Sequence, residues 1–176
     1  EAKRLIKEYL ADKGLEKLPP IELKYNTSEG HKKLAVAMQG MWKKHLGIEI
    51  KLLNMEWKVF LATTYKRDFI LARGGWIGDY VDANTFLHMW RTEDGHNNTG
   101  WSNARYDELL DLAAKEKNQE KRFEYFQECE AILAEEMPVL PIYFYVHVTL
   151  RDPSVKGWHP TLLDHHPYQY VYLEED

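Results

Sequence analysis

The sequence predicts an α/β fold in which a mainly parallel sheet carries helices on its faces. Three observations predict it: strand-like alternation at 21–25 and 48–53, an apolar run at 69–72, and helical apolar spacing in the segments between them. This β-α-β-α-β order favours parallel pairing, because parallel neighbours need crossover connections, which are right-handed. Ligands of such sheets lie beyond the carboxyl ends of the strands, so a site is expected directly after the third strand.

Helical spacing begins at the amino terminus. Residues 1–13 place apolar side chains on one face, which we expect to be buried, and the run stops before the prolines at 19–20. A second helix follows capping candidates at 26–28 and ends at Gly47. Its expected inward side chains are Leu34, Met38, Met41 and Trp42. A short helix at 56–65 leads into the third strand, which we expect to be covered on both faces.

The second half of the chain is less regular. Apolar spacing predicts one helix around 106–113 and another around 123–133, which Pro138 closes. The apolar and aromatic segment Val139–Val148 predicts a strand, and Pro141 favours an edge position or a strand start. We therefore expect an α/β lobe over residues 1–156.

A tail of different composition follows at residues 157–176. Its residues Tyr168, Tyr170 and Tyr172 alternate as in a strand. A strand without its natural neighbour is an exposed edge that invites pairing, so we predict a concentration-dependent dimer of this chain through the tail. Light scattering that stays monomeric over a wide concentration range would count against the dimer.

Composition excludes several classes of function. The 28 acidic residues against 23 basic ones give a net charge of −5 and offer no basic stripe for a phosphate backbone, which excludes nucleic acid as a partner. No apolar stretch approaches the roughly 18–20 residues that span a bilayer. The charged, helical start does not resemble a signal peptide, so either the protein is cytosolic or a targeting segment has been removed. The one cysteine, Cys129, lies in a helical pattern and is expected to be a small core residue.

The segment after the third strand carries the candidate site. Gly74, Gly75 and Gly78 leave main chain that an extended peptide can approach and pair with as an added strand. Arg73 can donate to a carboxylate, and Asp79 can accept from an ammonium group. Beside them, Trp76 offers a flat apolar wall. Together these residues suit a zwitterionic ligand, which carries both a carboxylate and an ammonium group.

Other interpretations of the same residues remain open. Glycine-rich loops after strands are common, and an Arg and an Asp six residues apart can simply neutralise each other. The glycine spacing is not that of a dinucleotide-binding loop, and we expect no cofactor. The densest histidine group, His159 with Asp164, His165 and His166, lacks a helical H-x-x-x-H pair, so we expect no metal site. No pair of carboxylates is placed as a hydrolase would need, and we expect no catalytic residue.

Three blocks resemble a known family in order and approximate spacing. They read ARGGWIGDYVDANTFLHMW, NNTGWSNARYDELLDLAAKE and RFEYFQECEAILAEEMPVLPIYFYV. They resemble the bacterial extracellular solute-binding proteins of family 5, which capture peptides and oligopeptides for ABC importers. The resemblance covers nearly the whole chain. It implies the C-terminal lobe of a class II periplasmic-binding-protein fold.

The resemblance also implies a function. A two-lobed protein would enclose a short peptide between its lobes and deliver it to a membrane permease. It would work in the periplasm or, lipid-anchored, at the surface of a bacterium, and it would not be an enzyme. The tail from residue 157 would pack on the other lobe.

Individual site residues follow from the matched motifs. The resemblance implies that Asp79 receives the peptide α-amino group and that Arg73 meets the carboxylate of shorter peptides. It assigns main-chain contacts to the segment 74–77, which comprises Gly74, Gly75, Trp76 and Ile77, and it makes Tyr145 a pocket residue. Relatives of this fold also bind nickel, haem or oligosaccharides. Stacking of a sugar on Trp76, Trp90 and Trp101 is one alternative, and a hydrolase using the same cleft is another.

Overall fold

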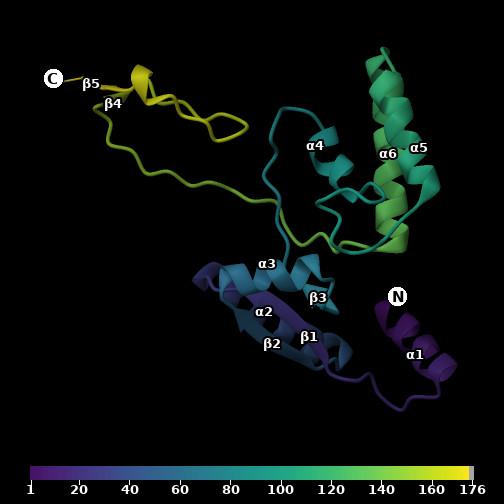
Figure 1. Cartoon of the computed structure of the whole chain (residues 1–176). Helices are drawn as coiled ribbons and strands as arrows, with labels where there is room; N and C mark the ends of the chain where they lie inside the picture. The colour runs from purple at the N-terminus through teal and green to yellow at the C-terminus, as the bar shows by residue number, and fades with distance from the viewer. Residues whose placement is uncertain (175–176) are drawn as a thin grey trace. The chain divides into compact units, whose positions relative to one another are not determined.

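Three parallel strands lie at the centre of the first of two units, Glu1–Gly75, in the computed structural model, which describes residues 1–174 (Figure 1). Strand β1 (Ile21–Asn26) lies between β2 (Ile50–Met55) and β3 (Leu71–Ala72). Helices α2 (Glu29–Leu46) and α3 (Trp57–Tyr65) make the two crossovers and pack on the sheet. Both pairings are parallel, so the predicted α/β class is confirmed.

Strand β1 is covered on both faces. Leu23, Lys24 and Tyr25 are all buried, although neighbours in a strand point to opposite sides. Leu23 and Tyr25 belong to a hydrophobic core that also contains Ala35 of α2. On the other face, the Lys24 ammonium donates to the main-chain carbonyl of Asp68 and lies 3.4 Å from its carboxylate. The buried charge is therefore satisfied within the unit.

Two details of the first unit correct the sequence predictions. Helix α1 (Ala2–Lys13) has no buried residue, although Ile6 packs partly buried against the core. In α2, Met38 is buried but Met41 is 52% exposed. The apolar stripe follows Ala35, Met38 and Trp42, and Met41 lies beyond its edge.

The third strand is also shorter than predicted. Only Leu71–Ala72 pair with β1, and Ile70 is 66% exposed, so the expected cover on both faces is wrong there. Because β3 is at the edge of the sheet in the order β2-β1-β3, it has a neighbour on one side.

A helical hairpin organises the second unit, which begins at Trp76. Helices α5 (Ala104–Lys115) and α6 (Gln119–Glu136) pack side by side (Figure 1), and the short helices α4 (Asn84–Leu87) and η1 (His88–Trp90) precede them. Both long helices were predicted. Their core consists of Leu87, Tyr106, Leu109, Leu110, Ala113, Phe126, Cys129 and Leu133.

Cys129 is buried at the centre of this core, as predicted. Burial raises the pKa of its thiol to about 12. Because the thiolate is the reactive form of cysteine, Cys129 acts as a small apolar residue.

The segment Val139–Val148 does not form the predicted strand. No segment within residues 1–174 pairs with it, and it runs through the structure without regular secondary structure. Its side chains are largely exposed, Phe144 at 96%. A strand forms only where the backbone N–H and C=O groups can hydrogen-bond to a neighbouring strand. Apolar composition alone does not supply that neighbour.

A small antiparallel pair joins the tail to the residues just before it. Strand β4 (Val155–Lys156) pairs with β5 (Tyr172–Leu173), and η2 (Tyr168–Tyr170) is a 3-10 turn, so the predicted three-tyrosine strand is wrong over its first two members. This pairing joins residues on both sides of the boundary expected at 156, and the separation of the tail from the lobe stays a prediction. None of the helices in the described part of the chain is long and apolar enough to cross a membrane.

Gly157 is required where the tail folds back. Its φ is +73°, and a Cβ atom there would lie 1.8 Å from the Tyr170 carbonyl oxygen. We predict that Gly157→Ala disrupts the β4–β5 pair and speeds hydrogen exchange at the Glu174 amide, which donates to the Ser154 carbonyl at 2.9 Å. Gly95→Ala is the matched control, because nothing in the described residues lies within 4 Å of its Cβ position. Equal exchange in both variants would contradict the prediction.

Candidate functional site

The first unit presents candidate residues at the carboxyl end of its sheet. The Arg73 amide donates to the Lys24 carbonyl at 2.8 Å, which continues the pairing of β3 with β1. Gly74 and Gly75 follow and are exposed. Apart from Gly74 and its two chain neighbours, no atom of the described residues lies within 4 Å of a Cβ built at this position. Packing therefore does not demand glycine at 74, and the main chain there is accessible to a ligand.

The same edge of the sheet holds a residue that the sequence analysis treated only as a capping candidate. Asn26 ends β1, and its side-chain oxygen is buried without a donor among residues 1–174. A buried carbonyl oxygen left in this way costs free energy, which makes it a candidate acceptor for a ligand. Its place at the carboxyl end of the first strand is the sequence signal for this role, because ligands of parallel sheets lie beyond the strand carboxyl ends.

The second unit begins with the loop that carries the other candidates, Trp76–Ala83. The indole of Trp76 meets the ring of His96 edge-on at 4.8 Å, and its Nε1 is buried without an acceptor in the described chain. Ile77 is 74% exposed. Asp79 is also exposed, so its carboxylate is accessible to a cationic group.

Helix α4 holds the main chain at Asp79. The Asp79 amide donates to the hydroxyl of buried Thr85 at 3.0 Å. At Gly78, an added Cβ would lie 3.1 Å from both the Thr85 methyl group and the Phe86 ring. Gly78 therefore allows the loop to pack closely on α4, which differs from the role in ligand access predicted from the sequence.

An ion pair anchors the far end of the loop. Arg122 of α6 donates to both carboxylate oxygens of Asp82, at 2.7 and 2.8 Å. The same carboxylate accepts from the Asn84 amide at 2.9 Å, at the start of α4. No local sequence pattern predicts this contact, because its partners are 40 residues apart.

This ion pair makes stability depend on pH. The Arg122 guanidinium holds the pKa of the Asp82 carboxyl below its ordinary value of 3.8. The unfolded chain therefore takes up this proton before the folded chain does, so the stabilisation is present above pH 3.8 and is lost as the pH falls through the folded pKa. We predict that Asp82→Asn reduces the loss of unfolding free energy between neutral pH and pH about 3, measured by urea unfolding. A pH dependence equal to that of the wild type would contradict this assignment.

Tyr145, the remaining candidate, lies in the extended segment of the second unit. It is 54% exposed, and its ring lies 5.0 Å from the Tyr143 ring at 60°. Its aromatic ring is therefore accessible to a ligand.

Two of the tryptophans considered for sugar stacking pack against the hairpin core. Trp90 and Trp101 are partly buried there, and the Trp101 Nε1 donates to Glu136 at 2.6 Å. The buried amide of Asn97 donates to the carbonyls of both tryptophans, at 3.2 and 2.9 Å. Asn97 thus fixes the main chain at both tryptophans, and their rings pack within the second unit.

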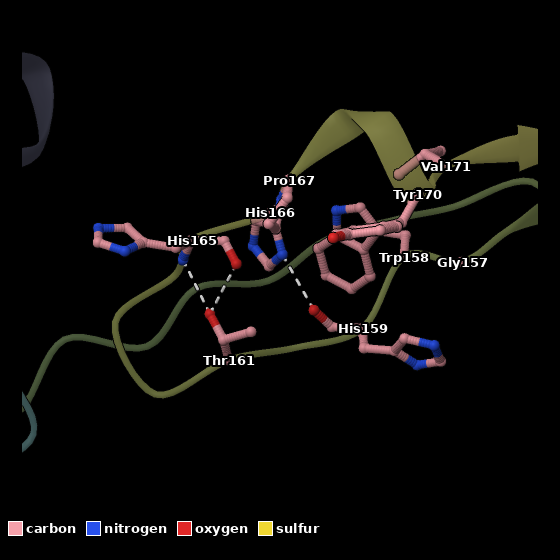
Figure 2. Close-up of a pocket in the computed structure, with 9 residues that line it drawn as sticks. All are labelled: Gly157, Trp158, His159, Thr161, His165, His166, Pro167, Tyr170 and Val171. Atoms are coloured by element: carbon pink, nitrogen blue, oxygen red, sulfur yellow. Dashed lines mark hydrogen bonds between the residues drawn. The ribbon is translucent and has the colours of Figure 1, made fainter.

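A pocket of about 280 Å³ lies in the tail, between Trp158 and Tyr170. His166 stacks on Trp158 at 4.2 Å, and its ring nitrogens lie 2.7 Å from Asp164 and 3.0 Å from the His159 carbonyl. The rings of His159 and His165 point away from that of His166 (Figure 2). Among residues 1–174, no group of three or more His, Cys, Asp or Glu side chains is arranged to hold a metal ion.

A second hollow, of about 390 Å³, lies along α3 between Lys58 and Asp68. The predicted ligand residues line neither this hollow nor the pocket in the tail.

Comparison with known proteins decides the family. Residues 1–98 match the profile described as bacterial extracellular solute-binding proteins, family 5 middle. The chain belongs to this family. Among curated relatives of this family 5 chain, the oligopeptide-binding protein OppA of Bacillus subtilis is 41% identical over 160 residues, which are 89% of this chain and 29% of OppA. The dipeptide-binding protein DppE of the same organism is 37% identical over 174 residues, covering 99% of this chain and 31% of DppE.

Solved structures of family 5 solute-binding proteins give the same result. The murein tripeptide-binding protein MppA of Escherichia coli matches with a TM-score of 0.87 and 33% identity, over 99% of this chain and 35% of that one. Haemophilus influenzae OppA, in complex with RPPGFSPFR, matches with a TM-score of 0.84 and 30% identity, over 98% and 34%. The predicted family and fold are confirmed, whereas the roles of individual site residues stay predictions. This family 5 chain spans about a third of the length of the structures that it matches.

Proposed function

We propose that the whole protein binds short peptides outside the cytoplasmic membrane and delivers them to an ABC import permease. The carrying observation is similarity over almost the full chain to proteins whose names and structures specify peptide ligands, such as Haemophilus influenzae OppA with its bound peptide. Escherichia coli and Salmonella typhimurium relatives, each 36% identical over 90% of this chain, are named periplasmic oligopeptide-binding proteins. We place the protein in the periplasm or, lipid-anchored, at the cell surface of a bacterium.

In this proposal, the ligand is held by its ends and by its main chain. Asp79 accepts from the peptide ammonium, and Arg73 donates to the carboxylate of shorter peptides. The main chain at 74–77 pairs with the peptide as an added strand, and Tyr145 packs against one of its side chains. The accessible main chain at Gly74 and the exposed carboxylate of Asp79 support these roles. Because the contacts involve groups common to all peptides, the site accepts varied sequences.

In this proposal, a second lobe accounts for the finding that the predicted ligand residues line neither of the two pockets described above. Peptide sites gain affinity when the ligand is largely buried and water is excluded. We infer that the second wall of the site belongs to the other lobe, which this chain does not include. The tail from residue 157 and the exposed segment before it would pack there.

A second candidate ligand comes from one relative. The Escherichia coli protein named "Probable deoxycholate-binding periplasmic protein YgiS" is 38% identical over 154 residues, which are 88% of this chain. A bile acid has a carboxylate for Arg73 and an apolar body for Trp76, but no ammonium for Asp79. The exposed Asp79 therefore favours a peptide.

Native mass spectrometry of the two-lobed protein, purified from its host without added ligand, tests the proposal. We expect released masses that fragment as short peptides of mixed sequence. A bile acid, a sugar or a metal chelate as the released species would overturn the peptide assignment. Incubation with the released peptides should return them unchanged, since the proposal includes no catalysis, and cleavage would identify a hydrolase.

A further inference from the structure

Hydrogen bonds at Asp79 and at Asp82 hold the loop that carries Asp79 against α4. Both sets of bonds connect the loop to the ion pair between Asp82 and Arg122. Asp79 donates its amide to Thr85 of α4 at 3.0 Å. The carboxylate of Asp82 receives the Asn84 amide at 2.9 Å, and the Asp82 carbonyl receives the Thr85 amide at 3.3 Å. Asp82 thus fixes the start of the helix on which Thr85 lies.

Arg122 attaches this assembly to the hairpin core. Besides its two bonds to Asp82, its Nε donates to the Ala113 carbonyl at 3.2 Å, at the end of α5. The guanidinium also lies 4.6 Å from the centre of the Phe126 ring, which is buried in the core. The side chains of Arg122 and Asp82 are only 26% and 29% exposed. Three hydrogen bonds and one ring contact therefore fix the planar guanidinium of Arg122 in place. A lysine ammonium has no such planar, two-bond geometry and would hold Asp82 less rigidly.

We infer that Arg122 is a positioning residue for recognition of the peptide amino terminus: through Asp82 and α4 it sets where the Asp79 carboxylate stands. This inference rests on the proposed function. Arg122 itself lies on α6, makes its bonds within the unit and acts on the ligand through Asp79. Its loss would misplace one charge of the site rather than remove it, and misplacement by a fraction of an ångström weakens a directed hydrogen bond.

The test compares two peptides on the two-lobed protein by calorimetry: trialanine with a free amino terminus, and N-acetyl-trialanine. Arg122→Gln and Asp82→Asn are each expected to lower affinity for the free peptide by about tenfold, the scale of a weakened bond to a charged group. Affinity for the acetylated peptide should stay unchanged, because it has no ammonium. The double variant should lose no more than either single variant, and Arg122→Lys should restore little.

Arg105→Gln is the matched control. Arg105 of α5 also forms a two-bond pair across the hairpin, to Glu128 of α6 at 2.8 and 3.1 Å, but it does not contact the Asp79 loop. We expect it to leave both affinities unchanged. Arg122 variants that weaken both peptides equally, or neither, would overturn the inference and leave the proposed function intact. A wild-type protein that binds neither peptide, or binds both equally, would overturn the recognition of the amino terminus and the inference with it.

Discussion

Replacing Asp79 by alanine in the two-lobed protein is expected to lower its affinity for a short peptide by about 1.5–3 kcal/mol, the scale of a hydrogen bond to a charged group. The exposed carboxylate of Asp79 has its main chain fixed by Thr85, so the loss would come from the acceptor itself. Isothermal titration calorimetry with trialanine measures the effect. Asp79→Asn, which keeps one acceptor oxygen without the charge, should give an intermediate loss.

The control for this experiment is Asp12→Ala, which removes an exposed aspartate from α1, where its side chain is 70% exposed. It should leave peptide affinity as it is. Unchanged affinity in the Asp79 variant would remove this residue from the site, and the function would then rest on family membership alone.

Replacing Leu109 by alanine is expected to destabilise the helical hairpin by about 2–5 kcal/mol, because it removes buried methyl groups and leaves a cavity. Leu109 has no exposed surface and packs between α5 and α6, beside Tyr106 and Cys129. Urea unfolding followed by tryptophan fluorescence measures the change as a lower midpoint at an unaltered slope.

The matched control is Leu162→Ala in the tail, at a leucine that is 80% exposed. Surface substitutions of this kind usually change stability by less than about 0.5 kcal/mol. If both variants unfold at the same midpoint, the hairpin core is not the cooperative unit inferred from the burial of Leu109.

The candidate site was predictable to the extent that its signals are local. Arg73, Gly74 and Asp79 were found from their place after a strand and from the family motif, and the structure leaves Gly74 and Asp79 accessible. Asn26 was not predicted as a candidate ligand group, because its place before the second helix already gave it a role as a capping residue. The role in ligand access predicted for Gly78 differs from the packing role that the structure shows. The close approach of Thr85 and Phe86 depends on how α4 folds back on the loop, which the local sequence does not reveal.

The sequence by itself determined the family, the helices α1, α2, α3, α5 and α6, and the central parallel sheet. These elements could be predicted because helical and strand periodicity is visible in neighbouring residues. Helix α5 illustrates this, because its four buried residues, Tyr106, Leu109, Leu110 and Ala113, all lie in the range 106–113 that the apolar spacing predicted.

Only the tertiary structure decided whether Val139–Val148 pairs as a strand, whether Met41 is buried, and which residue holds the Asp79 loop. Each depends on a partner supplied by a distant part of the chain. Strand pairing needs another backbone and burial needs a facing surface, and the Arg122–Asp82 bond joins residues 40 positions apart.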